Sequence, residues 1–241
     1  LGLSGSLAGA AILVALIFDA VTDPVAGSLS DNWRGARGRR HPFMYAAAIP
    51  LGVSYVILFN PPSGYGQTGL FLWLTSFAIA VRAAMTLYHV PHLAMGAELS
   101  DDYQERTSIV AWRTMLAVVG GGLVTIASYE LFFPETPDFE NGMLNPAGYP
   151  RYAVFAGLTM LVTIWYSAFG TRDRIPYMPK APESPERFSF QRIFGEFASA
   201  WENISFRLSS LFHPHVRSYS DFILLSSRRK IPSFSSTEPA I

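Results

Sequence analysis

The chain of 241 residues contains no cysteine, and charged side chains make up only 15% of it. Without cysteine there is no disulfide framework, thiolate zinc site or thiol nucleophile to consider. The charged fraction is well below the roughly 25% typical of a soluble globular domain, whereas 50% of the residues are hydrophobic. The formal net charge is zero, so the overall balance does not indicate a nucleic-acid partner. This composition favours a membrane protein.

Long apolar runs are abundant in the chain. A hydrocarbon core about 30 Å thick needs roughly 20 mostly apolar residues per helix. The stretches that come close to this length occupy residues 3–29, 43–59, 70–97, 109–133 and 152–169. We therefore predict an all-α membrane protein with about five transmembrane helices within residues 1–170.

The remainder of the chain is polar, and we predict a cytoplasmic loop over residues 171–207. The Ser-rich stretch 208–241 has no apolar run of membrane length, so we predict a disordered or frame-shifted tail there. The chain opens on Leu1 rather than Met, which we interpret as the start of a fragment.

Lysine and arginine are concentrated in alternate connections between the apolar runs. The connections 31–42, 98–107 and 171–192 are rich in them, whereas the two connections between carry only Arg151. A cytoplasmic excess of basic residues sets the orientation of membrane helices, so we predict the amino terminus outside and the carboxyl tail inside. The predicted protein is an integral, multi-pass protein of the plasma (inner) membrane.

Ionisable side chains inside the apolar runs are the candidates for a functional site. An unpaired charge at membrane depth costs several kcal/mol, so such residues usually face a protein interior or an aqueous cavity. Asp19 and Asp23 share one helix face, and Arg82, Thr86 and His89 share another. A cavity lined by both faces would suit a cation or proton site beside a site for a polar solute. The chain shows no set of nucleophile, base and orienting residue, so we do not expect an enzyme.

Structural roles compete with these functional ones. Asp19 and Asp23 could neutralise Arg82 and Arg113 as structural ion pairs. Asp23 also precedes Pro24, which frees a backbone carbonyl, so local capping of a helix kink is a rival role. The glycines 120–122 indicate close approach of helix backbones rather than binding.

Two blocks of sequence resemble a known family of transporters. The first is "FDAVTDP" (18–24), followed by "SDNWRGARGRRHPF" (30–43), and the second is "YHVPHLAMGAELSDDYQERTSIVAWR" (88–113). They resemble the glycoside-pentoside-hexuronide:cation symporters, the melibiose-permease-like branch of the major facilitator superfamily. The resemblance covers residues 1 to about 207 and implies helices II to VI of the amino-terminal bundle, without helix I.

The resemblance also implies where a coupling cation would bind. An acidic pair on helix II binds the cation in that family, which places this role on Asp19 and Asp23. They would be metal ligands only if the coupling ion is sodium. A threonine that assists the cation corresponds to Thr86, and His89 is predicted to join this cation or proton site.

The predicted substrate site consists of Arg82, His89 and Arg113. Arg113 corresponds to a family arginine that contacts the sugar or its acidic partner. His89 stands where melibiose-type members have an aspartate that serves both sugar and cation, and Leu93 stands where they have a sugar-stacking tryptophan. An imidazole exchanges protons near neutral pH but ligates sodium poorly once protonated, so we predict coupling to H⁺ rather than Na⁺. No cofactor other than this ion is predicted.

The basic loop is predicted to be a gating element that pairs differently in the two states of alternating access. Its predicted gating residues are Asp31, Arg37, Arg39 and Arg40. By default, the same arginines are a topology signal that also contacts phospholipid headgroups.

The predicted function is symport of a sugar and a cation by alternating access, with a small-molecule substrate and the lipid bilayer as partners. Two alternatives stay open. One is symport of a solute other than a sugar, such as a lysolipid. The other is a membrane scaffold or nonfunctional fragment that transports nothing.

Overall fold

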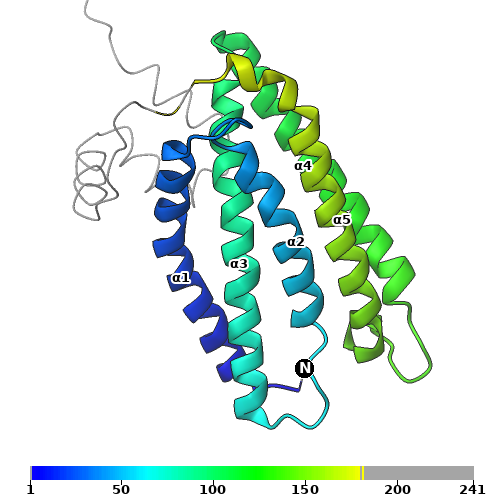
Figure 1. The fold of residues 1–241 in the computed structure, drawn as a ribbon. Helices are drawn as coiled ribbons and strands as arrows, with labels where there is room; N and C mark the ends of the chain where they lie inside the picture. The colour runs from blue at the N-terminus through cyan, green and yellow to red at the C-terminus, as the bar shows by residue number, and fades with distance from the viewer. Residues whose placement is uncertain (1, 180, 182–241) are drawn as a thin grey trace, which may run out of the picture. The chain divides into compact units, whose positions relative to one another are not determined.

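The computed structural model describes residues 2–179 and 181, and five long helices make up most of this part of the chain (Figure 1). The helices are α1 (Gly5–Asn32), α2 (His41–Leu58), α3 (Gln67–Glu98), α4 (Tyr103–Phe132) and α5 (Tyr149–Gly170). Short 3-10 helices are η1 (Gly142–Leu144), η2 (Pro146–Gly148) and η3 (Arg172–Tyr177). All five long helices are long and apolar enough to cross a membrane, so the predicted all-α membrane fold is confirmed. The predicted tail 208–241, and all but the beginning of the predicted loop 171–207, lie outside the described residues.

Helix α3 is the central element of the packed helices. It packs extensively against α1 and α2, and α2 packs in turn against α5 (Figure 1). Many of the buried side chains are small, including Ala11 and Ala15 of α1 and Ala47 and Ala48 of α2. Small side chains let helix backbones approach closely, which favours association in lipid, where helices gain little from hiding apolar surface. By contrast, α4 makes sparse contacts with α3 and α5.

Local capping decides where α4 begins. The apolar run predicts a start near Ile109, but the helix begins at Tyr103. The carboxylate of Asp102 accepts a hydrogen bond of 2.9 Å from the backbone N–H of Glu105, which satisfies one of the free donors at the helix start. Polar residues of the preceding connection therefore belong to the first turns of the helix.

The basic loop and the segment after α5 meet at one end of the packed helices. Gly38 has a φ of +77°, which disfavours any residue with a side chain. A Cβ at Gly38 would also lie 3.1 Å from Cγ2 of Ile175 in η3. Two connections that the positive-inside rule assigns to the cytoplasm therefore pack against each other.

Glycines bring α2 and α5 into backbone contact. A Cβ added to Gly52 would lie 3.0 Å from the carbonyl oxygen of Gly157, and a Cβ on Gly157 would lie 3.0 Å from the carbonyl oxygen of Gly52. The glycines 120–122 of α4 behave differently, because a Cβ placed there meets nothing within 4 Å in the described part of the chain. The close approach predicted for them is therefore absent among the described elements and occurs at Gly52 and Gly157 instead.

We expect Gly52→Leu to lower the stability of the protein, because the new side chain would push α5 away from α2. Forced overpacking of this kind typically costs about 1–3 kcal/mol. The apparent melting temperature of the detergent-purified protein would measure it. Gly9→Leu is the matched control, since a Cβ at Gly9 meets nothing within 4 Å among the described residues. Equal destabilisation by both substitutions would contradict the proposed contact.

Candidate functional site

Four polar side chains face one another between α1 and α3, and we call them the acidic seam. Asp19 and Asp23 lie one turn apart on α1, and Arg82 and Thr86 lie one turn apart on α3. The Arg82 guanidinium donates to Oδ2 of Asp19 in an ion pair. The Thr86 hydroxyl donates to Oδ1 of Asp23 at 2.7 Å. The shared spacing of four residues on both helices makes the two contacts possible at once.

The two halves of the acidic seam differ in what they leave available. The Asp19 side chain is 19% exposed, and its second oxygen, Oδ1, is buried without a hydrogen-bond partner in the described structure. A buried acceptor without a partner is costly, so a hydrogen-bond donor at this oxygen would be stabilising. Asp23 is exposed, although Thr86 beside it is buried. The seam therefore offers one shielded and one accessible carboxylate.

Pro24 interrupts the backbone hydrogen bonds of α1 next to the acidic seam. The hydroxyl of Thr22 donates to the carbonyl of Phe18 at 3.1 Å and to that of Asp19 at 3.4 Å, so it satisfies backbone acceptors in this turn. The Asp23 carboxylate instead accepts a hydrogen bond from Thr86 of the neighbouring helix α3. Neither bond of Thr22 reaches the Ala20 carbonyl that Pro24 frees, and the Asp23 carboxylate is engaged by the seam.

The remaining predicted site residues lie further along α3 and on α4. His89 is exposed, and Arg113 lies beside Gly96, where Nη1 is 3.9 Å from the position of an added Cβ. His92 stacks on Tyr88 with ring centroids 5.1 Å apart. The structural alternative of an Asp23–Arg113 ion pair is not among the contacts of the described residues. The predicted site thus divides into the acidic seam and two residues outside it, His89 and Arg113.

A second ion-pair network joins three helix ends at the basic loop. Glu98 ends α3, and one of its oxygens, Oε1, accepts from both Arg39 and Arg40, with Nη2 of Arg40 at 2.6 Å. Asp31 near the end of α1 lies 3.1 Å from Nη2 of Arg40 and 4.0 Å from Nη1 of Arg39. We call these four residues the loop network. Of the predicted gating residues, Arg37 is exposed, whereas the other three belong to the network.

Glu98 is the member of the loop network that the sequence did not single out. It directly follows the apolar run 70–97, so it looks like the first residue of a polar connection. The available signal was its position: a carboxylate at a helix C-terminus is disfavoured by the helix dipole unless a cation offsets it. Two arginines supply that cation here.

Sequence comparison identifies the family. The family described as MFS/sugar transport protein matches residues 1–211. The chain belongs to this family. The inner membrane symporter YicJ of Escherichia coli strain K12 is 23% identical over 87% of this chain and 42% of its own length. YagG of the same strain, which carries the name of a glycoside/cation symporter, is 30% identical over 73% of this chain and 37% of its own length.

A vertebrate relative differs in its named solute. The sodium-dependent lysophosphatidylcholine symporter 1-A of Danio rerio is 30% identical over 45% of this chain and 20% of its own length. The chain spans less than half the length of these relatives. Its predicted place among the glycoside-pentoside-hexuronide:cation symporters is confirmed. With five helices able to cross a membrane, it is an integral, multi-pass membrane protein.

We expect Asp19→Asn to destabilise the protein, because it leaves the Arg82 guanidinium without its carboxylate. A fully buried pair loses about 3–5 kcal/mol in this way. Because the Arg82 side chain is 38% exposed, we expect about 1–3 kcal/mol. Thermal unfolding of Asp19→Asn, Arg82→Gln and the double variant would measure the coupling. The double variant should lose less than the sum of the single losses, and strict additivity would contradict a direct pair.

Proposed function

We propose that the protein containing this chain is a secondary active transporter that moves a glycoside together with a cation, with H⁺ favoured over Na⁺. The observation that supports the proposal is the shielded Asp19 carboxylate. Its Oδ2 accepts from Arg82, and its Oδ1 is without a partner among the described residues. The family and the named symporters among its relatives support transport rather than catalysis.

The chemistry of the acidic seam supports cation coupling. A carboxylate at membrane depth is stabilised by a proton or a cation, because either removes its uncompensated charge. Protonation of Asp19 would weaken its pair with Arg82, so occupancy of the site would change how α1 and α3 are held together. If one conformation of the transporter binds the cation better, the cation favours that conformation. A solute that also binds this conformation better is then transported together with the cation.

Within the described residues, no group of three His, Asp or Glu side chains converges as a metal site. A sodium ion at Asp19 or Asp23 would therefore need oxygen ligands of another kind, such as the Thr86 hydroxyl beside Asp23. A proton needs a single carboxylate or an imidazole such as His89, which is exposed on α3. This difference supports H⁺ as the coupling ion.

One observation favours a second candidate, symport of a lysolipid. Leu93, one turn beyond His89 on α3, is 39% exposed and offers an aliphatic contact where the resemblance places a sugar-stacking tryptophan. A relative of the chain bears the name of a lysophosphatidylcholine symporter. An amphiphilic solute would use such a mixture of imidazole and apolar surface.

The transport proposal is tested by uptake into proteoliposomes under separately imposed H⁺ and Na⁺ gradients. Labelled glycosides and a labelled lysophospholipid would be offered in parallel. We expect glycoside uptake driven by the H⁺ gradient, and a loss of at least about tenfold in Asp19→Asn and Asp23→Asn, because an amide cannot exchange a proton near neutral pH.

The control for these variants is Asp138→Asn, which makes the same chemical change at an exposed position in the loop after α4. It should transport as the unmodified protein does. If no glycoside is taken up, the sugar proposal is wrong. Gradient-driven uptake of lysophospholipid alone would establish the second candidate. Uptake indifferent to both seam substitutions would remove the seam from the coupling site.

The Thr86–Asp23 hydrogen bond gives a sharper test of the cation site. We expect Thr86→Val to raise the cation concentration needed for half-maximal uptake by about tenfold, since a contact to a carboxylate is worth roughly 1.5–3 kcal/mol. Thr86→Ser keeps the hydroxyl and should restore the original value. Thr75→Val is the matched control on the same helix, because its hydroxyl donates only within α3, to Phe71 at 2.7 Å. Equal effects of the two valine substitutions would contradict the assigned role.

A further inference from the structure

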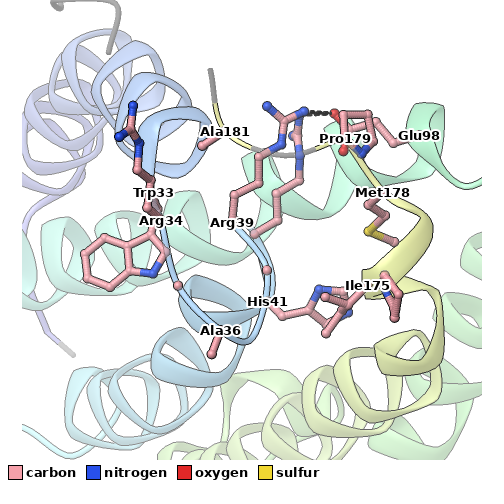
Figure 2. Close-up of a pocket in the computed structure, with 14 residues that line it drawn as sticks. Trp33, Arg34, Ala36, Arg39, His41, Glu98, Ile175, Met178, Pro179 and Ala181 are labelled. Carbon is pink, nitrogen blue, oxygen red and sulfur yellow. Dashed lines mark hydrogen bonds and ion pairs between the residues drawn. The ribbon is translucent and has the colours of Figure 1, made fainter. Parts of the chain in front are cut away.

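A pocket of about 590 Å³ lies at the end of the packed helices that the sequence predicts to be cytoplasmic. It is bounded by the loop 33–40, by the end of α3 and by residues 175, 176, 178, 179 and 181 (Figure 2). Its volume falls within the roughly 300–1,000 Å³ typical of small-ligand sites. The acidic seam contributes no residue to its lining, so the pocket is separate from the proposed transport site.

One part of the lining is basic. Arg34, Arg39 and Arg40 line the pocket together with a single carboxylate, that of Glu98. Asp31 contacts Arg39 and Arg40 from outside the lining. Even with Asp31 counted, the arginines outnumber the carboxylates among the described residues around the pocket. The positive end of the α2 dipole also borders it, because α2 begins at His41 and that residue belongs to the lining.

The arginines of the loop network still have hydrogen-bond capacity to spare. The Arg40 side chain is only 7% exposed, and its Nε is buried without a partner in the part of the chain that the structure describes. Nε of Arg39 is in the same situation. Burial of a charged donor without an acceptor is costly. An anion seated in the pocket would provide oxygen acceptors for these groups.

Other parts of the lining are apolar. Trp33 lies on one side of the pocket and Ile175 and Met178 lie on the other (Figure 2), with Pro176 and Pro179 completing this surface. A small inorganic anion would gain nothing from such a wall. An anionic group attached to an apolar or glycerol-like body would use both the basic and the apolar parts. The pocket also lies where the helices end, which is the level of lipid headgroups.

We propose that this pocket binds a phosphate ester, with the phosphate on Arg34, Arg39 and Arg40 and the organic part against Trp33 and Ile175. Phosphate oxygens match the planar, multiple donors of guanidinium groups. The same chemistry is offered by the headgroup of an anionic phospholipid and by a soluble organic phosphate. Binding at this position would tie the loop network to the segment after α5, independently of the transported solute.

The test uses the delipidated protein in a nonionic detergent and phosphate-free buffer. Dihexanoyl phosphatidylglycerol and glycerol 3-phosphate would be titrated separately, with calorimetry and the apparent melting temperature as readouts. We expect saturable binding and a rise in melting temperature. Tight binding of the lipid alone identifies a headgroup site, whereas comparable binding of both compounds identifies a site for the phosphate ester itself.

Two pairs of variants locate the binding. Arg34→Gln removes a guanidinium from the lining, whereas Arg37→Gln makes the same change in the same loop outside the lining. Ile175→Glu puts a negative charge into the pocket without altering a residue of the loop network. Tyr177→Glu adds the same charge outside the lining, at an exposed position of the same 3-10 helix. We expect the pocket variants to weaken binding by about tenfold or more, because Arg34→Gln removes a charge-assisted contact and Ile175→Glu adds a charge that repels the phosphate.

The control variants should stay within about threefold of the unmodified affinity, a difference that corresponds to well under 1 kcal/mol. The melting temperature without ligand checks that each variant is folded. Absence of saturable binding by both compounds would overturn the proposal. Equal weakening by a pocket variant and its matched control would overturn it as well, because binding would then follow overall charge rather than the pocket.

Discussion

The cost of charge in a hydrocarbon layer is the constraint on which this structure depends. Two carboxylates on one helix are tolerable only if a second helix presents donors at the same height and spacing. Arg82 and Thr86 meet that requirement for Asp19 and Asp23, and in doing so they fix the register of α3 against α1. Apolar contacts alone could not do this, because lipid tails compete equally well for apolar side chains.

Much of the fold was predictable because membrane helices follow from length and apolar composition. The ends of the helices were harder to predict. The start of α4 depends on one capping contact from Asp102, although the spacing of Asp102 and Glu105 is a recognisable helix-start signal. Small residues were also ambiguous. They permit close approach without choosing a partner, so Gly52 and Gly157 touch, whereas the glycines 120–122 touch none of the described elements.

The candidate site was predictable as a set of residues but not as a set of contacts. Periodicity placed Asp19 and Asp23 on one face, yet it could not decide whether Asp23 would meet Arg113 or Thr86. That choice depends on the rotation and tilt of each helix, which are set by packing against neighbours. Glu98 was missed for a related reason. Basic residues in loops determine the orientation of membrane helices, whereas acidic residues contribute little to it. The role of an acidic residue such as Glu98 therefore becomes visible only when the fold places it beside the arginines.

The loop network has one further consequence, which follows from the sharing of partners within it. A single Glu98 oxygen holds two arginines, and Asp31 stands beside both of them. Either arginine can therefore leave while the other keeps Glu98 neutralised. The charge of Glu98 at the junction of α1, α2 and α3 therefore does not depend on a single arginine.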